Sequence, residues 1–302
     1  MQTITVLPSA AVPVSVHAGA SCPICESKAQ PCFMAGPHKM YRCASCRTAF
    51  VHPMPSDEYL ARFYSTYHEG ASDETNYAME GKMMAHHPAQ LACVLAHSPR
   101  GVGRLLDVGC GKGFFLSHCQ SQGLECMGVE LSDVGAAYAR RELKLDVRQG
   151  DLHELKGSLG TFRTATMWGV IEHLPDPMRT LRDIFEILEP GGQLFVQTGI
   201  GDDWFDRLLP GVNQWYDPPQ HLFVFSAPGL ARSLQLAGME CVFLDSKYDR
   251  STARRAARFV RNSIVGVGLR AVASLGRLSS GEFQMTKFPL AFDMMAVGQK
   301  PG

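Results

Sequence analysis

The sequence lacks the long apolar run of a membrane-spanning helix, because no uninterrupted apolar stretch reaches about 18 residues. Its first twenty residues contain neither Lys nor Arg, which a secretory signal requires in its opening region. The formal net charge is +0, so no overall charge draws the chain of 302 residues toward nucleic acid or an anionic surface. We therefore expect a cytoplasmic protein whose residues 1–20 are disordered.

The ten cysteines lack the regular spacing of a disulfide framework, which favours a reducing compartment. Four of them form two Cys-x-x-Cys pairs, Cys22 with Cys25 and Cys43 with Cys46. Each pair directs two thiolates at one centre, and two pairs complete a tetrahedral Zn²⁺ shell. Such a closed shell leaves no position for water, so a structural metal is expected in a zinc-ribbon-like module over residues 21–52. Fortuitous cysteines or a redox pair are the alternatives. The weaker alternative ligands are Cys32, His38 and His52.

A glycine-rich stretch at residues 105–113 forms the expected floor of a ligand site. An apolar run ends at Asp107, and three glycines follow at alternate positions from Gly109. Glycine has no Cβ and tolerates positive φ, so the backbone can approach a ligand there, and the next helix presents free N–H groups. A dinucleotide site requires its third glycine one residue later, where Phe114 stands, and Asp107 would repel a pyrophosphate. The stretch therefore favours a nucleotide-type ligand that carries positive charge.

Strand and helix patterns alternate from residue 103 onward. This alternation predicts parallel strands with helices on both faces, and ligands at the carboxyl ends of the strands. The expected strands are 104–108, 126–131, 146–149, 164–168, 193–198, 239–248 and 293–299. The expected helices are 113–122, 132–143, 177–189 and 227–237. A helical linker or cap over residues 53–100 precedes them, with one helix from Ser56 and a second over 81–97, interrupted near Pro88.

Five motifs follow one another along this region, at 107–113, at Glu130, at 150–152, at 170–177 and at 188–192. In this order they resemble the class I S-adenosylmethionine-dependent methyltransferases. The resemblance implies a Rossmann-like α/β fold over residues 101–302, with a seven-stranded sheet that is mostly parallel and has an antiparallel last strand. It also implies S-adenosylmethionine as methyl donor and S-adenosylhomocysteine as product. The front of the chain, with its zinc module, Pro-x-Pro segment and Tyr-rich helix, is similar to bacterial enzymes of glycan, lipid and natural-product gene clusters.

The resemblance assigns cofactor contacts residue by residue. The implied contacts are Asp107 for the methionine ammonium, Gly109 and Gly111 for backbone clearance, Glu130 for the ribose, Leu131, Asp151 and Leu152 for adenine, and Trp168 and Gly169 for the methionine portion. Plain core packing is the alternative for Leu131, Leu152 and Trp168, and a solvated strand end is the alternative for Glu130. Tyr64 lies before the expected methyltransferase domain, and its side chain either covers the ligand or simply packs against other side chains.

The acceptor side is expected in an insertion over residues 200–226, because loops beyond a parallel sheet build such pockets. His221 is the candidate general base or acceptor ligand, since an unperturbed histidine titrates near 6.5. His173 is the second candidate, and for both histidines the alternative is a hydrogen bond that fixes a loop. The candidate substrate-binding residues are Trp204, Trp215, Tyr216 and Asp217.

A basic helical insertion is expected over residues 250–285, where seven arginines and no acidic residue lie between Arg250 and Arg277. An amphipathic helix of this kind packs on its own chain or a second copy, or binds an anionic or lipid-linked acceptor, or contacts nucleic acid. The leading hypothesis is methyl transfer to a hydroxyl of a small-molecule, natural-product or glycan acceptor. A zinc-ribbon-containing RNA methyltransferase of the ribosomal-RNA type is the alternative, and a non-catalytic S-adenosylmethionine-binding module is a third. No Asn-Pro-Pro-Tyr segment follows the fourth strand, which argues against amino groups of DNA.

Overall fold

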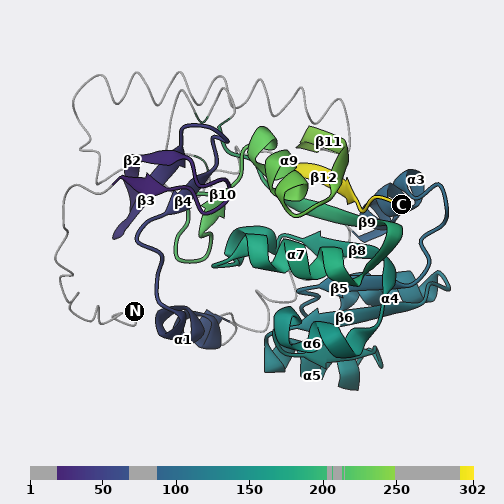
Figure 1. The fold of residues 1–302 in the computed structure, drawn as a ribbon. Helices are drawn as coiled ribbons and strands as arrows, with labels where there is room; N and C mark the ends of the chain where they lie inside the picture. Colours follow the sequence, from purple (N-terminus) through teal and green to yellow (C-terminus); the bar gives the residue numbers. More distant parts are fainter. Residues whose placement is uncertain (1–18, 68–86, 203–205, 207–212, 214, 249–292) are drawn as a thin grey trace, which may run out of the picture.

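The computed structural model of the chain describes residues 19–67, 87–202, 206, 213, 215–248 and 293–302 (Figure 1). These residues form two β-sheets that lie next to each other, a seven-stranded sheet and a five-stranded one. No helix among the described residues is long and apolar enough to cross a membrane.

The seven-stranded sheet is the Rossmann-like sheet that the motifs imply. Its strands, in spatial order, are β11 (Glu240–Tyr248), β12 (Asp293–Gln299), β9 (Leu188–Gly199), β8 (Phe162–Trp168), β5 (Leu105–Val108), β6 (Cys126–Glu130) and β7 (Val147–Gln149). The strands from β9 to β7 pair in parallel, whereas β12 is antiparallel to both of its neighbours. The expectation of a mostly parallel sheet with an antiparallel last strand is therefore confirmed.

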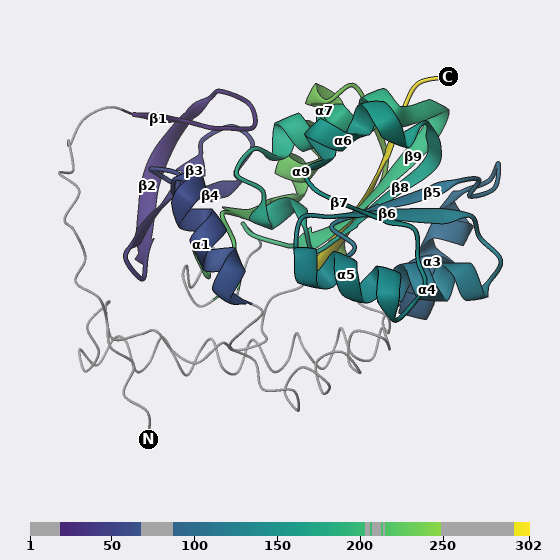
Figure 2. The same cartoon turned by 90° about the horizontal axis from the view of Figure 1, so that it is seen from below.

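Helices cover both faces of this sheet, as Figure 2 shows. One face carries α6 (Leu152–Leu159), α7 (Pro177–Ile187) and α9 (Ala227–Leu236), and the other carries α3 (His87–His97), α4 (Phe114–Ser121) and α5 (Asp133–Arg141). Several of these helices begin where a capping side chain accepts from a free N–H group. At the start of α5, the Ser132 side chain accepts from the backbone N–H of Gly135. The side chains of Asp176 and Ser226 accept in the same way from the third residue after them, at the starts of α7 and α9.

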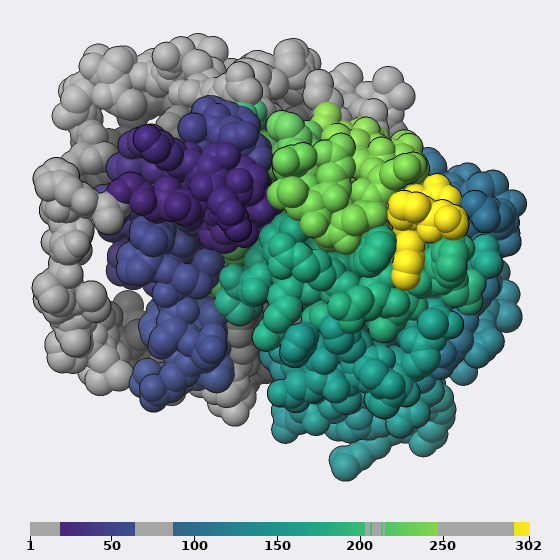
Figure 3. Space-filling model, viewed as in Figure 1, coloured from purple at the N-terminus to yellow at the C-terminus, as the bar shows by residue number. Residues whose placement is uncertain are grey.

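The five-stranded sheet forms the N-terminal module, and all its pairings are antiparallel. Its strands, in spatial order, are β1 (Ala20–Ser21), β2 (Lys28–Ala35), β3 (His38–Cys43), β4 (Ala49–Val51) and β10 (Phe223–Val224). The last of these comes from the far half of the chain and adds to the edge of the module, where Phe223 pairs with Phe50. The space-filling view shows the module and the α9 region as one continuous surface (Figure 3). The pairing of β10 with β4 thus joins the module to a segment from the second half of the chain.

Several element boundaries differ from those that the sequence predicts. The helix α7 ends at Ile187 rather than at 189, and β9 begins at Leu188 rather than at 193, so that it includes the Pro-Gly-Gly segment at 190–192. The residue Pro88 does not interrupt α3 but lies in its first turn, where a missing N–H costs nothing. The second helix of the linker was expected to start at residue 81, which lies outside the described residues. The basic insertion expected over 250–285 also lies outside them.

The expected disordered segment and helical cap are partly described. Residue Ala20 belongs to β1, and residues 1–18 lie outside the described part. The helix α1 spans Asp57–Tyr67, as expected for a helix starting from Ser56. The backbone of Tyr64 lies in α1, but its side chain is outside the described part.

Candidate active site and zinc module

The glycine turn after β5 leaves an open space beside the backbone. Gly109 has a φ of 70°, and a Cβ added there would lie 2.7 Å from Val170, so the packing of the turn requires glycine. Gly111 has a φ of 54°, and an added Cβ would meet no atom of the described residues within 4 Å. The backbone at Gly111 therefore faces room for a ligand, which fits its expected role beside the cofactor.

Asp107 lies under this turn and is 3% exposed. Thr166 donates its hydroxyl hydrogen to Asp107 Oδ1 at 2.6 Å. Burial raises the pKa of Asp107 to about 7, the hydroxyl of Thr166 opposes this shift, and the charge of Glu130 adds to it. A buried carboxylate whose hydrogen-bond donor is a neutral hydroxyl is suited to a cationic ligand group, such as the methionine ammonium that the resemblance implies.

Glu130, at the end of β6, joins the glycine turn to the start of α5. The Gly111 N–H donates to Glu130 Oε2 at 2.7 Å, and the Ser132 N–H donates to Oε1 at 2.8 Å. Each carboxylate oxygen retains acceptor capacity, so two ribose hydroxyls can still donate to it. Leu131 follows with 66% of its surface exposed, and an exposed apolar side chain here suits the face of an adenine ring.

Asp151 and Leu152 follow β7 and start α6. Asp151 caps the helix by accepting from the His153 N–H at 2.8 Å, and its other oxygen accepts from Arg179 at 3.0 Å. Both carboxylate oxygens thus have protein partners, so a contact to the adenine amino group uses their remaining lone pairs. The side chain of Leu152 is buried in the core, whereas its N–H, in the first turn of α6, has no intrahelical acceptor.

Trp168 ends β8 at the same edge of the sheet. Its ring lies edge-on to Phe115 of α4, with 5.2 Å between centroids. The buried indole N–H of Trp168 has no acceptor among the described residues. Gly169 follows with a φ of 67° and redirects the chain away from the sheet.

Three side chains converge beyond β8, namely Glu172 and His173 of the short 3₁₀ helix η1 (Ile171–His173), and His221. Their candidate ligand atoms all lie within 4.8 Å of one another. The segment before β10 runs beside η1, because the Leu222 N–H donates to the Glu172 carbonyl at 2.8 Å and His173 Nδ1 donates to the Gln220 carbonyl at 2.7 Å. The structure therefore brings together both predicted histidines and adds a carboxylate.

Glu172 was missed by the sequence reasoning, although it directly precedes His173 in the motif at 170–177. Burial raises the pKa of Glu172 to about 7. Burial also lowers the pKa of His173, while the carbonyl groups of Gln220 and Gly169 oppose that shift. His173 is therefore largely neutral near pH 7.

Of the four candidate substrate-binding residues, Trp215 lies against this cluster. Its ring centroid is 5.1 Å from that of His221, and its buried indole N–H has no acceptor among the described residues. The ring packs on the backbone of Gly199, where an added Cβ would lie 2.0 Å from it. The backbone carbonyl of Asp217 accepts from the backbone N–H of His221 at 3.1 Å. Trp204 lies outside the described residues.

Tyr216 has a different environment, because its hydroxyl connects the acceptor-side segment to the zinc module. It donates to Asp206 at 2.8 Å and accepts from Arg42 Nη2 of β3 at 2.7 Å. Arg42 also pairs with Asp206 at 2.8 Å and with Asp202 at 3.1 Å, and Arg47 pairs with Asp202 at 2.9 Å. Burial and the charge of Asp206 raise the pKa of Tyr216 well above its usual value, so this hydroxyl stays protonated. We name these five residues the module clamp.

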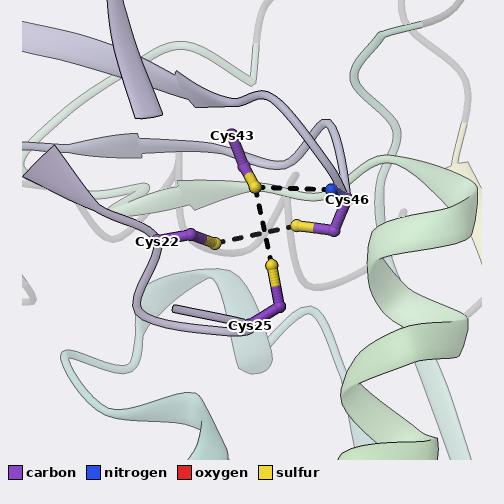
Figure 4. A group of neighbouring side chains, drawn as sticks. All are labelled: Cys22, Cys25, Cys43 and Cys46. Atoms are coloured by element: carbon purple, nitrogen blue, oxygen red, sulfur yellow. Dashed lines mark hydrogen bonds between the residues drawn. The ribbon is translucent and has the colours of Figure 1, made fainter. Parts of the chain in front are cut away.

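The four predicted metal ligands form one cluster between the two knuckles of the module (Figure 4). Cys22 Sγ lies 3.7 Å from Cys46 Sγ, and Cys25 Sγ lies 3.5 Å from Cys43 Sγ. Four thiolates at about 2.3 Å from one Zn²⁺ ion in tetrahedral geometry are separated by about 3.8 Å. The hydrogen bond from the Cys22 thiol lowers the pKa of Cys46 to about 5. The donor set therefore fits structural zinc, and Cys32 of the same module lies elsewhere, bonded to the Met40 carbonyl at 3.2 Å.

Comparisons with known proteins identify the family of this chain. A family model described as a methyltransferase domain matches residues 80–244. The ubiquinone biosynthesis O-methyltransferase of Coxiella burnetii is 27% identical over 166 residues, which cover 49% of this chain and 71% of that protein. The protein of the same name from Xanthomonas oryzae is 28% identical over 151 residues, which cover 44% and 63%.

Solved structures show the same fold at low identity. A chain of the complex between the Haloferax volcanii Trm112 methyltransferase activator and a protein assigned as a methyltransferase is 18% identical, with a TM-score of 0.52 over 82% of this chain and 100% of that chain. A protein of Galdieria sulphuraria assigned as a sarcosine dimethylglycine methyltransferase is 12% identical, with a TM-score of 0.50 over 81% and 99%. Since the family model spans more than half of the 302 residues, the chain belongs to the methyltransferase-domain family and is a class I S-adenosylmethionine-dependent methyltransferase.

Proposed function

We propose that this methyltransferase methylates a hydroxyl group of a small-molecule, natural-product or glycan acceptor. The observation that carries the proposal is the convergence of Glu172, His173 and His221 beyond the end of β8, next to Gly169. Proton-accepting groups at this place suit an oxygen nucleophile, which must lose a proton when it is methylated. The relatives named for O-methylation in ubiquinone biosynthesis add support for an oxygen acceptor.

The cofactor side orients the donor. S-adenosylmethionine supplies an activated methyl group on a sulfonium centre when it is bound. We infer that the Asp107 carboxylate accepts from the methionine ammonium, and that the open backbone at Gly111 accommodates the ligand. Glu130 accepts from the ribose hydroxyls, and the exposed Leu131 lies against adenine. Holding the donor in this way allows in-line attack by a bound nucleophile.

The acceptor side supplies the base. His221 Nδ1 lies 3.1 Å from the Trp215 carbonyl, which can only accept, so Nδ1 carries the hydrogen and Nε2 is the basic atom. The same argument applies to His173, whose Nδ1 bonds the Gln220 carbonyl. We infer that His221 accepts the proton of the acceptor hydroxyl, with His173 as the second candidate, and that the indole N–H of Trp215 donates to the acceptor.

The zinc module contributes structure to this proposal rather than chemistry. Its four thiols suit a structural Zn²⁺ ion and a reducing compartment, which supports a cytoplasmic enzyme. The module clamp and the pairing of β4 with β10 support the segment that contains His221.

The test combines donor binding with methyl transfer. Calorimetry measures S-adenosylhomocysteine binding, and a panel of phenols, polyhydroxylated natural products and sugars is assayed for O-methyl products by mass spectrometry. We expect binding, at least one O-methylated product, and a loss of turnover of about 10²-fold or more in His221→Gln. His153→Gln, altered on helix α6 where the His153 side chain pairs with Asp183, is the matched control and should retain full turnover. Methylation of total RNA with a steep decrease in binding as salt rises, and no small-molecule product, would instead favour the RNA alternative.

A further inference from the structure

The carboxylate of Glu172 is buried and accepts no well-formed hydrogen bond from the residues that the structure describes. Glu172 is 2% exposed, and neither Oε1 nor Oε2 has a hydrogen-bond partner among the described residues. The Thr198 hydroxyl is nearby but makes no well-formed hydrogen bond to it. Burying an unpaired carboxyl group costs several kcal/mol, so a purely structural residue at this position would be expected to find a donor. The position instead suits an external positive group.

The two histidines beside it are held in the orientation that metal ligands use. The carbonyls of Gln220 and Trp215 accept from Nδ1 of His173 and His221, at 2.7 Å and 3.1 Å respectively. These bonds fix the neutral tautomer in which Nε2 carries the lone pair. A backbone carbonyl on the second ring nitrogen is the usual support of a histidine that binds a metal. Their ring centroids are 4.9 Å apart, so the two rings lie side by side.

The main chain fixes this geometry independently of any ligand. Glu172 and His173 are neighbours in η1, and the Leu222 N–H bonds the Glu172 carbonyl at 2.8 Å. His221 is therefore held next to Glu172 by the residue that follows it. The three candidate ligand atoms lie within 4.8 Å of one another, a separation that small side-chain rotations can close around one ion.

We propose that Glu172, His173 and His221 form a second metal site, which binds a divalent first-row transition-metal ion with one carboxylate and two imidazoles. Two nitrogen ligands and one oxygen ligand favour such an ion over Mg²⁺ or Ca²⁺, which prefer oxygen alone. Three protein ligands leave coordination positions open, unlike the closed four-thiolate cluster of the module. An open position beside Gly169 lies where the acceptor must approach the donor.

This inference rests on the proposed function and specifies its acceptor as a hydroxyl group that can bind the ion. Coordination lowers the pKa of the hydroxyl, and its proton passes to solvent water. The oxygen then forms a bond to the methyl carbon while the bond from that carbon to sulfur breaks, and the electron pair stays on sulfur. The products are the methyl ether and S-adenosylhomocysteine, so no oxidant or reductant is needed. In the metal-loaded enzyme His173 and His221 are ligands, and the ion takes over the task of promoting deprotonation.

The test measures the metal directly, with Mn²⁺ as the probe, because this ion has little preference for a thiolate cluster. The purified zinc-loaded full-length protein is titrated with Mn²⁺, and free ion is followed by electron paramagnetic resonance, with Co²⁺ absorption as a second readout. We expect one Mn²⁺ site per chain, and at least a tenfold weaker site in Glu172→Gln and in His221→Asn. His153→Asn is the control and should bind as the wild type does. Retained S-adenosylhomocysteine binding verifies that each variant is folded.

The outcomes separate this inference from the proposed function. Binding of neither Mn²⁺ nor Co²⁺ to the folded wild type, or equal binding by wild type and Glu172→Gln, overturns the metal site. If methyl transfer to hydroxyl groups also proceeds unchanged in a chelator that leaves the module zinc in place, the histidines act as bases and only this inference fails. Metal binding that depends on Glu172 without any O-methylated product supports the site and contradicts the proposed function.

Discussion

The two halves of the candidate active site are built in different ways. The cofactor half consists of turns that directly follow β5, β6 and β7, and its key contacts join residues close in sequence, such as the Gly111 N–H with Glu130, 19 residues apart. The acceptor half joins distant segments. His173 bonds Gln220 across 47 residues, and Arg42 bonds Tyr216 across 174 residues.

This difference indicates that the two halves depend on different supports. The cofactor half rests on the parallel sheet, whose core strands β5 and β8 are almost completely buried. The acceptor half rests on β10, which pairs with β4 of the N-terminal module, while the next residue, Phe225, forms a bridge with Ile200 just after β9. Ser226 strengthens the connection, because its hydroxyl caps α9 and also donates to the Cys46 carbonyl of the second knuckle. We therefore expect damage to the module to impair acceptor methylation while donor binding persists.

The largest effect is expected on removal of a zinc ligand. Cys43→Ser leaves three thiolates, and the loss of Zn²⁺ removes a folding contribution on the order of 10 kcal/mol from a small module with little core of its own. We expect loss of bound zinc by elemental analysis, loss of methyl transfer, and S-adenosylhomocysteine affinity within about threefold of wild type by calorimetry.

The matched control for this variant is Cys32→Ser. Cys32 is exposed, lies in the same module and contacts the Met40 carbonyl rather than the thiol cluster. The Cys32→Ser variant should retain its bound zinc and its methyl-transfer turnover. Equal loss of donor binding and methyl transfer in Cys43→Ser would contradict the separation of the two halves.

A smaller effect is expected from breaking the module clamp. Arg42→Met removes the guanidinium that pairs with the buried carboxylate of Asp206 and leaves that carboxylate with the neutral donors of Tyr216 and Asp202. Loss of one member of a buried ion pair typically destabilises by about 3 kcal/mol or more. Chemical denaturation should detect this loss, and acceptor turnover should decrease more than donor affinity. Arg47→Met is the comparison variant, because the Arg47 side chain is 42% exposed and its loss should cost less than about 1 kcal/mol. An equal loss of stability in the two variants would show that the clamp does not depend on the buried pair.

The smallest effect concerns the cofactor half alone, through Asp107. Its pKa is raised to about 7 from an ordinary value of 3.8, so the protonated carboxyl favours the folded state, and this contribution is lost as pH rises from about 4 to about 7 and is constant above that. Donor binding has the opposite dependence, because the ionised carboxylate pairs with the methionine ammonium. We expect S-adenosylhomocysteine affinity to increase up to about tenfold per pH unit below 7 and to level off above it.

The variant Asp107→Asn sharpens this point. It retains an acceptor for the Thr166 hydroxyl but has no charge to offer, so donor affinity should decrease about 10- to 100-fold at pH 8 and lose its pH dependence. Its free energy of unfolding without ligand should exceed that of the wild type at pH 8, since no buried charge remains. Zinc content should be unchanged. A pH-dependent affinity in the variant equal to that of the wild type would assign the titration to another group.

Much of the fold and the cofactor half could be predicted from sequence because the signals are local. The alternation of strand and helix patterns defines the parallel sheet, and each cofactor residue lies within a few positions of a strand end. The two Cys-x-x-Cys pairs predicted a cluster that the structure forms, since each turn brings two thiols together by itself. The start of β9 was predicted at residue 193, five residues after its actual start at Leu188, because the Pro-Gly-Gly segment resembles a simple helix stop.

By itself, the sequence determined the methyltransferase sheet, the donor and the four thiols of the module. Only the tertiary structure placed Phe223 on the edge of the module, used the hydroxyl of Tyr216 to hold Arg42, and set the buried carboxylate of Glu172 beside two histidines. The physical reason is that periodicity and turn chemistry report on neighbours along the chain. The partners of a buried charge or an edge strand are chosen by packing between segments far apart in sequence.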